Sequence, residues 1–206
     1  MFPYRLPRYI AFCGVPKSGK SLAQEILRDN YGVQPVDDGA ILREFAVKNL
    51  GANHDQVHTQ EGKASLASWP NGDPIIDART GEYLTWRRVL GLYGNQLEAM
   101  FGPHVMPMTA CARIEGFKGP FSFGSVRRDQ GRYYQNHGGI IVGINNPLAV
   151  PTGNEFDEFD PSIVDCWIEN DGLARGLSHT RALADLTTKI HQLVINCHLG
   201  QIQKAA

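Results

Sequence analysis

The chain has 206 residues, of which 20 are Lys or Arg and 21 are Asp or Glu, so its formal net charge is −1. This length predicts one domain, with room for an inserted segment, that can bury a core without disulfides or metals. The balanced charge argues against a nucleic-acid polymer or a membrane surface as partner, and no apolar run approaches the about 18 residues that span a membrane.

The N-terminus and the cysteines predict a cytoplasmic protein. The first residues contain no apolar segment of the kind found in secretory signals. The cysteines are far apart in the sequence and form no CxxC pair, so we expect buried, reduced thiols rather than a disulfide framework. They are Cys13, Cys111, Cys166 and Cys197.

Short apolar runs alternate with segments of helical periodicity, which predicts an α/β fold. In chain order, we expect a strand at 9–13, a helix at 21–30, a strand at 33–36, helices at 40–50 and 83–101, a strand at 120–126, a helix at 129–137, strands at 139–144 and 163–168, and a helix at 178–199. This alternation favours a central, mostly parallel five-stranded sheet with helices on both faces.

Two segments have weak periodicity. Residues 51–82 are rich in Gly, Asn, Asp, Thr and Gln, and we expect there a mobile subdomain or loop system with at most short helices. Residues 145–162 are rich in proline and acidic residues. The carboxylates between 154 and 160 could form a cation site, but we favour a mobile acidic lid.

The segment after the first expected strand matches the P-loop pattern G-x-x-x-x-G-K-[ST], with a strand before it and a helix after it. Its residues are Gly14, Val15, Pro16, Lys17, Ser18, Gly19, Lys20 and Ser21. The glycines let backbone N–H groups converge on phosphate oxygens at a helix N-terminus. Lys20 would place a positive charge near the β- and γ-phosphates, and the Ser21 hydroxyl would bind Mg²⁺. The pattern therefore predicts a nucleoside triphosphate site, against the alternative of a glycine turn with an incidental lysine.

Arginines follow two other expected strands. Asp37 and Asp38 follow the strand at 33–36, with Arg43 on the next helix, and Arg127 follows the strand at 120–126. Because parallel strands end at one edge of the sheet, Arg43 and Arg127 would converge on an anion that faces the nucleotide. Guanidinium groups hold phosphate well, and a phosphate acceptor needs no strong general base. Each arginine alone could equally form a surface salt bridge.

These motifs resemble the nucleoside monophosphate kinases, and more narrowly the phage-type deoxynucleoside monophosphate (dNMP) kinases. The resemblance covers most of the chain in the same order. It rests on the P-loop, Asp37-Asp38-Gly39 with Arg43, the segment from Arg87 to Gly94, Ser125-Val126-Arg127-Arg128, Gly138-Gly139 before a strand, and Asn170-Asp171-Gly172.

The resemblance implies a three-layer P-loop kinase fold that transfers the γ-phosphate of ATP to a dNMP, with Mg²⁺, in the cytoplasm (that of the host for a phage protein). Residues about 40–115 would be an inserted acceptor-binding segment. Lys20, Arg127 and Arg128 would be catalytic. Asp37, Asp38, Arg43, Arg88 and Arg127 would lie on the acceptor side, and Asn170 near the donor base.

The chain departs from this family at three places. Asp129-Gln130-Gly131 stands where an Asn-Glu often follows the family's Val-Arg segment. Ser125 replaces an acid that lies near Mg²⁺ in the family, so Asp37 or Asp38 would have to supply the carboxylate. The loop from Asn145 to Asp160 lacks the family's lid arginines. The charge of the transition state would then be met by Lys17, Lys20, Arg127, Arg128 or Arg132.

Two other functions remain open. One is a P-loop kinase that resembles dephospho-CoA or deoxynucleoside kinases, whose hydroxyl acceptor would need Asp37 or Asp38 as a base. The other is a nucleotide-binding ATPase or regulator without a small-molecule acceptor. The sequence also leaves open the accepted bases and whether the chain forms a homodimer.

Two further patterns favour structural roles. His54 and His58 have the spacing of a helical zinc site, but no third ligand is evident, and a solvated loop is favoured. Four aromatic residues are expected to form core and pocket walls rather than a stacking platform for nucleic acid. They are Trp69, Trp86, Tyr93 and Phe101.

Overall fold

The computed structural model describes residues 4–151 and 158–202. The chain divides into two compact units, Met1–Asp38 with Cys111–Ala206, and Gly39–Ala110. The expected elements form in the expected order in both units. No helix in the described part of the chain is long and apolar enough to cross a membrane.

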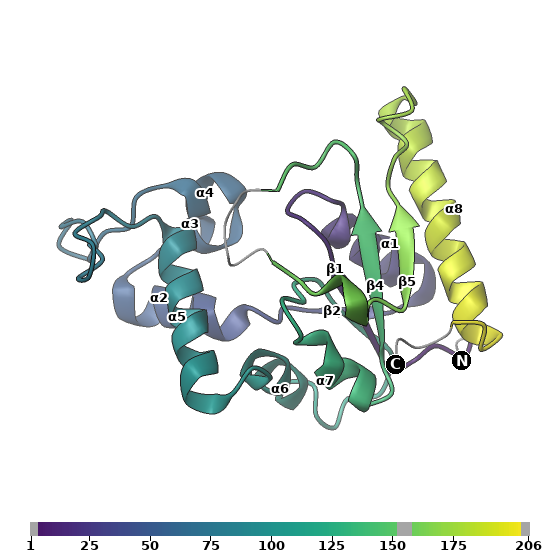
Figure 1. Cartoon of the computed structure of the whole chain (residues 1–206), viewed down its shortest axis with the longest axis horizontal. Coiled ribbons are helices and arrows are strands. Elements are labelled where there is room, and N and C mark those ends of the chain that lie inside the picture. Colours follow the sequence, from purple (N-terminus) through teal and green to yellow (C-terminus); the bar gives the residue numbers. More distant parts are fainter. Residues whose placement is uncertain (1–3, 152–157, 203–206) are drawn as a thin grey trace. The chain divides into compact units, whose positions relative to one another are not determined.

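The first unit contains one five-stranded sheet (Figure 1). Its strands are β1 (Tyr9–Cys13), β2 (Gln34–Val36), β3 (Phe121–Phe123), β4 (Ile140–Asn145) and β5 (Cys166–Glu169). The spatial order is β2-β3-β1-β4-β5, and every pairing is parallel. The loops after these strands therefore lie at one edge, and the predicted α/β class is confirmed.

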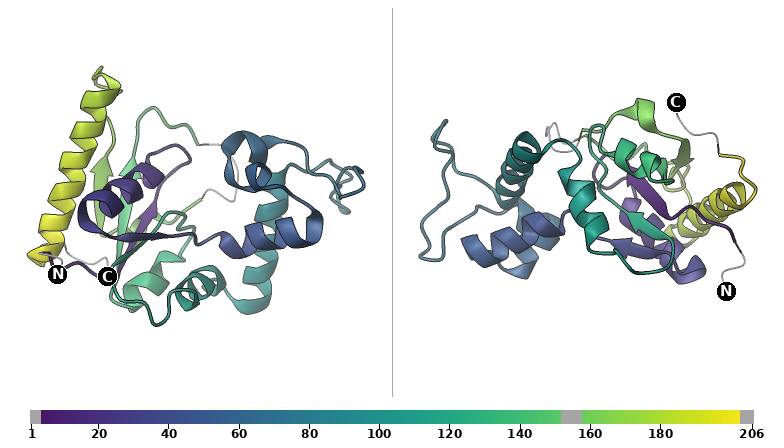
Figure 2. Two further views of the ribbon diagram at one scale, coloured as in Figure 1. Left: turned by 180° about the vertical axis from the view of Figure 1, so that it is seen from behind. Right: turned by 90° about the horizontal axis from the view of Figure 1, so that it is seen from below.

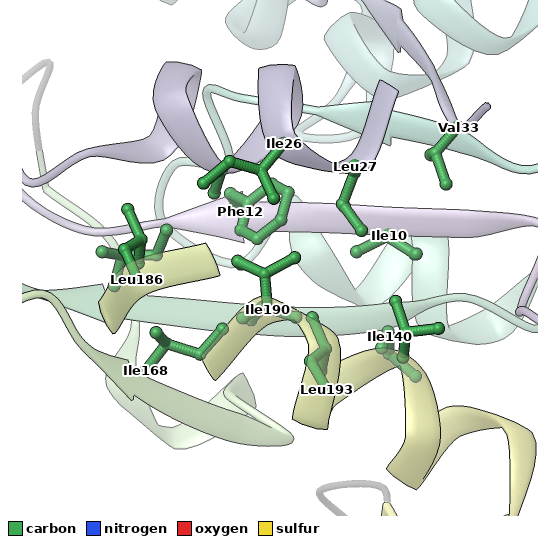
Figure 3. Close-up of a cluster of buried hydrophobic side chains, with 14 residues drawn as sticks. Ile10, Phe12, Ile26, Leu27, Val33, Ile140, Ile168, Leu186, Ile190 and Leu193 are labelled. Atoms are coloured by element: carbon green, nitrogen blue, oxygen red, sulfur yellow. The ribbon is translucent and has the colours of Figure 1, made fainter. Parts of the chain in front are cut away.

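Side chains of β1 alternate between two helical layers. Ile10 and Phe12 are fully buried in a cluster with α1 (Lys20–Tyr31) and α8 (His179–His198), which Figure 3 shows in close-up. Tyr9 faces the other side, where its ring centroid lies 6.1 Å from that of Tyr134 on α7 (Gly131–Asn136). Helices thus cover both faces of the sheet, as the sequence predicts.

The second unit is helical. It contains α2 (Ala40–Leu50), α3 (His54–His58), α4 (Gln60–Ala64), α5 (Trp86–Phe101) and most of α6 (Val105–Ala112). Figure 2 shows α2 beside α5, where a Cβ on Gly94 would lie 3.4 Å from Leu42. The short helices expected within 51–82 are confirmed, and antiparallel bridges such as Ile76–Tyr83 complete that segment.

Several sequence-based boundaries and burial predictions are wrong. Helix α6 was not expected, because Pro107 interrupts its pattern, although proline is tolerated in a first turn. Strand β5 begins at Cys166 rather than 163, because residues Pro161–Ile163 form a short 3₁₀ helix that the Asp160 side chain caps. Trp69 and Phe101 are 45% and 64% exposed, so they are not core residues.

The other two aromatic residues pack as expected. Trp86, the first residue of α5, is fully buried, and Tyr93 is partly buried, with its ring stacked on that of Phe45 at 4.0 Å.

All four cysteines are free thiols, as predicted, but only Cys13 is fully buried and the other three are partly buried. Burial raises the pKa of Cys13, Cys166 and Cys197 to about 12, and it also raises the pKa of Cys111. These side chains are therefore protonated at neutral pH.

Candidate functional site

The P-loop connects β1 to α1 in the geometry that phosphate binding requires. Gly14 has φ +134°, and a Cβ there would lie 2.5 Å from the carbonyl oxygen of Ile144 in β4. Gly19, with φ +111°, immediately precedes α1. Lys17 adopts φ +67°, a left-handed conformation that side chains other than glycine rarely take. The chain can make this turn only with glycine at the two tightest positions.

Lys20 lies across the loop. Its Nζ donates to the carbonyl oxygens of Gly14 at 2.7 Å and Val15 at 2.9 Å. Ser18 is fully buried, whereas Ser21, in the first turn of α1, is exposed. The helix N-terminus and the ammonium group give the loop positive potential, which suits an anionic ligand.

A buried carboxylate lies at the same sheet edge. Asp38, two residues beyond β2, is 8% exposed, and its Oδ2 accepts the backbone N–H of Ser125 at 2.9 Å. Burial raises the pKa of the Tyr134 phenol well above its usual value, and the negative charge of Asp38 raises it further. Asp37 is exposed. The Asp38 carboxylate therefore lies beside Ser125, two residues beyond the end of β3.

Arg127 and Arg128 follow β3 at this edge. The N–H of Val126 donates to the carbonyl of Phe12 at 3.2 Å, so the chain rejoins β1 just before the P-loop. Arg128 has φ +44°, and its N–H donates to the carbonyl of Glu158 at 2.9 Å. The P-loop, both aspartates and these arginines thus belong to one unit.

Asn170 also reaches the P-loop. It follows β5, and its Nδ2 donates to the carbonyl oxygen of Ser18 at 2.8 Å. The side chain is therefore engaged with the loop backbone.

The remaining predicted acceptor residues belong to the second unit. The Nε of Arg43 donates to the carbonyl of Val57 at 3.2 Å, and the N–H of Arg88 donates to Thr85 at the start of α5. Hydrogen bonds from Arg79 lower the pKa of the Asp77 carboxyl, and the charge of Arg88 lowers it further. The convergence of Arg43 and Arg127 on one anion stays a prediction.

Gly39 makes room for the Arg43 guanidinium. A Cβ on Gly39 would lie 2.3 Å from Nη1 of Arg43, while its φ of −96° is ordinary. We expect Gly39→Ala to displace the guanidinium and to raise the KM for an anionic acceptor roughly 10-fold, with a stability cost of only about 1 kcal/mol. Steady-state kinetics of G39A, R43A and the double variant check this, because G39A should add nothing once Arg43 is removed. An additional loss in the double variant would contradict the role given to Gly39.

Sequence reasoning missed three side chains near the site. Gln24 on α1 donates to the backbone of β3 at 3.0 Å, and Asn146 donates to the carbonyl of Lys17 at 3.4 Å. Tyr134 packs near Asp38. Asn146 could have been found because it follows an expected strand. The other two lie within helices, where periodicity does not show what a polar side chain reaches.

The sequence offers two alternative metal sites, a zinc site at His54 and His58 and a cation site among the carboxylates between 154 and 160. The His54 and His58 rings stack with centroids 4.2 Å apart, and among the described residues no three His, Cys, Asp or Glu side chains gather as a metal site. Residues 152–157 lie outside the described residues, and with them two of the four carboxylates of the predicted acidic lid, Glu155 and Asp157. Of its remaining carboxylates, that of Asp160 accepts the N–H of Ser162, which caps the short helix Pro161–Ile163.

No protein-family model and no curated protein matches the chain. Among solved structures, the chain is similar to shikimate kinase from Acinetobacter baumannii in complex with shikimate, at 15% identity and a TM-score of 0.41, over 94% of this chain and 95% of that one. It is also similar to an unliganded sugar kinase from Janibacter, at 14% identity and a TM-score of 0.35, over 89% and 94% of the two chains. A protein from Thermus thermophilus matches at 16% identity and a TM-score of 0.39, over 98% and 87%.

Proposed function

We propose that the chain is an Mg²⁺-dependent kinase that transfers the γ-phosphate of ATP to a deoxynucleoside monophosphate, giving ADP and a dNDP. The observation that carries the proposal is the P-loop, in which Gly14 packs against the backbone of β4 and Lys20 lies across the turn at the N-terminus of α1. A loop of this shape binds the phosphates of a nucleotide.

The oxygen donors near the loop fit Mg²⁺, which prefers hydroxyl, carboxylate and water oxygens. Ser21 supplies an exposed hydroxyl in the first turn of α1, and Asp38 supplies a carboxylate at the same sheet edge. When bound there, the ion would neutralise charge on the β- and γ-phosphates. Asp38 would then replace the acid that the resembled kinases carry where this chain has Ser125.

Arginines support a phosphate acceptor. Arg43 and Arg127 match positions that grip the acceptor phosphate in the resembled family, and Arg88 lies on α5, the helix that would line the acceptor side. An acceptor phosphate is already ionised near neutral pH, so its oxygen attacks the γ-phosphorus without first losing a proton to a base. The protein has to align two anions and neutralise their charge, a task for which guanidinium groups are well suited.

A coupled assay of ADP release tests the proposal. Purified protein with ATP and Mg²⁺ is offered each of the four common dNMPs and modified ones. We expect release that depends on at least one dNMP and is accompanied by formation of the matching dNDP. ATP turnover that ignores every added nucleotide would instead favour an ATPase or regulator.

One observation favours a second candidate, a P-loop kinase with a hydroxyl acceptor. Such a reaction requires a base to take the hydroxyl proton. Asp38 is a buried carboxylate at the sheet edge, and its Oδ2 already accepts one backbone N–H, which fixes its orientation. Hydroxyl compounds, including deoxynucleosides and dephospho-CoA, therefore belong in the acceptor panel.

Asp38→Asn separates the two candidates, because asparagine retains an acceptor for the Ser125 N–H but carries no charge. If Asp38 acts only near Mg²⁺, we expect kcat to fall about 10- to 100-fold and the Mg²⁺ requirement to rise. If Asp38 is the base, kcat should fall about 10²- to 10⁴-fold, and the acidic limb of the pH profile should disappear. The surface variant Asp29→Asn, whose parent side chain is exposed and pairs with the exposed Arg28, is the control. An unchanged kcat and Mg²⁺ requirement in D38N would remove Asp38 from both mechanisms.

A further inference from the structure

Asn170 connects the last strand of the sheet to the P-loop. Its backbone N–H donates to the carbonyl of Asn145 at 2.7 Å, which extends the pairing of β4 with β5 by one residue. Its side-chain Nδ2 donates to the carbonyl oxygen of Ser18 at 2.8 Å. The sheet therefore fixes the backbone of Asn170, and the side chain of Asn170 binds the backbone of the P-loop.

The second glycine of the motif permits this contact. A Cβ on Gly19 would lie 2.5 Å from the Nδ2 of Asn170, too close for any side chain to remain beside it. Gly19 thus has two reasons to be glycine, namely its φ of +111° and the close approach of this amide.

The turn that carries Asn170 is fixed to α8. Lys189 Nζ lies 2.7 Å from the Asp171 carboxylate and donates to the carbonyl of Glu169 at 2.6 Å. Arg175 pairs with the same aspartate at 3.1 Å. A Cβ on Gly172 would lie 2.8 Å from that of Ala182, so the turn also packs directly on the helix. The contacts with α8 therefore fix the position of the turn that carries Asn170.

The carbonyl and the N–H of a trans peptide point in opposite directions. Holding the Ser18 carbonyl toward Asn170 therefore directs the N–H of Gly19 away from Asn170. A backbone N–H that is already oriented needs no reorganisation when an anion arrives. We propose that Asn170 is a positioning residue that orients the Ser18–Gly19 peptide for the polyphosphate part of the donor, rather than a residue that recognises the donor base.

This proposal rests on the proposed nucleotide binding, and its test uses two probes, ATP with Mg²⁺ and inorganic tripolyphosphate, which has no base. Calorimetric titration of the full-length protein gives the Kd of each probe for the wild type, Asn170→Ala and Asn145→Ala. Asn145 is the matched control because it is an asparagine at the end of the neighbouring strand whose exposed side chain donates to Glu169 instead of to the loop carbonyl of Ser18.

We expect N170A to raise the Kd of both probes by the same factor, about 3- to 10-fold, while N145A leaves both Kd values unchanged. Asn170→Asp keeps the shape of the side chain but cannot donate from either oxygen, so it should raise both Kd values at least as much as N170A does. Weaker ATP binding with unchanged tripolyphosphate binding would show that Asn170 recognises the nucleoside, and unchanged binding of both would show that it positions nothing. Either result overturns the proposal. A wild type that binds neither probe would refute nucleotide binding itself, and the proposal with it.

A thermal measurement tests the contact independently of any ligand. Gly19→Ala should lower Tm in the wild-type background by more than in the N170A background. In the wild type the new Cβ overlaps the Asn170 amide and the backbone is strained by its positive φ, whereas in N170A only the backbone strain remains. Equal losses in the two backgrounds would contradict the contact on which the proposal depends.

Discussion

Replacing Lys20 by alanine is expected to lower kcat/KM for phosphate transfer by about 10³-fold, a larger effect than the one expected of D38N in the proposed reaction. In the free protein its ammonium group donates hydrogen bonds to two loop carbonyls, and in the proposed reaction it would face the β- and γ-phosphates, where negative charge changes during transfer. The coupled ADP-release assay with the preferred acceptor measures the loss.

The control is Lys118→Ala, which removes an exposed lysine from the same unit and should leave kcat/KM unchanged. Thermal unfolding of K20A accompanies the kinetics, since a folded but inactive variant is required. If K20A transferred phosphate to a dNMP at a near-normal rate, the P-loop would not be the donor site and the proposed function would be wrong.

The largest expected effect on stability is that of Gly14→Ala. Its φ of +134° is strained for any L-residue by about 1–3 kcal/mol, and the new Cβ would overlap the carbonyl oxygen of Ile144, which the β4 ladder holds in place. We expect the free energy of unfolding to fall by about 2 kcal/mol or more, and Tm by roughly 4–8 °C. Urea denaturation and thermal unfolding measure both.

Gly119→Ala separates strain from overlap. Gly119 has nearly the same φ, +136°, but a Cβ there would meet nothing within 4 Å. Gly119→Ala should therefore lose only the free energy that the strained φ costs, and it should unfold at a higher temperature than G14A. Equal melting of the two variants would mean that the contact of Gly14 with β4 is not tight.

The donor side of the site could be predicted from the sequence because its determinants are local. The apolar run from Tyr9 to Cys13, the glycines at 14 and 19 and the helical spacing after Lys20 lie within a few turns of chain. Each of these features acts through its neighbours in the sequence: glycine by permitting a positive φ, and the helix by its own periodicity. The structure contains the strand, the loop and the helix where this local reasoning places them.

The contacts that hold the site together could not be predicted in this way. Asp38 meets Ser125 across 87 positions, and Asn170 meets Ser18 across 152. No periodicity encodes such pairs, because they depend on which strands become neighbours. The bond from the Ile141 N–H to the Asp165 carboxylate, just before β5, is a further contact of this kind.

The buried thiols make the protein convenient for fluorescence measurements. A thiol with a pKa of about 12 has roughly one thiolate in 10⁵ molecules at pH 7, so Cys13, Cys166 and Cys197 should react very slowly with maleimide dyes. Once the partly buried Cys111 is replaced, one new exposed cysteine in each unit would be labelled preferentially. Energy transfer between the two dyes could report whether ATP and an acceptor bring the units together.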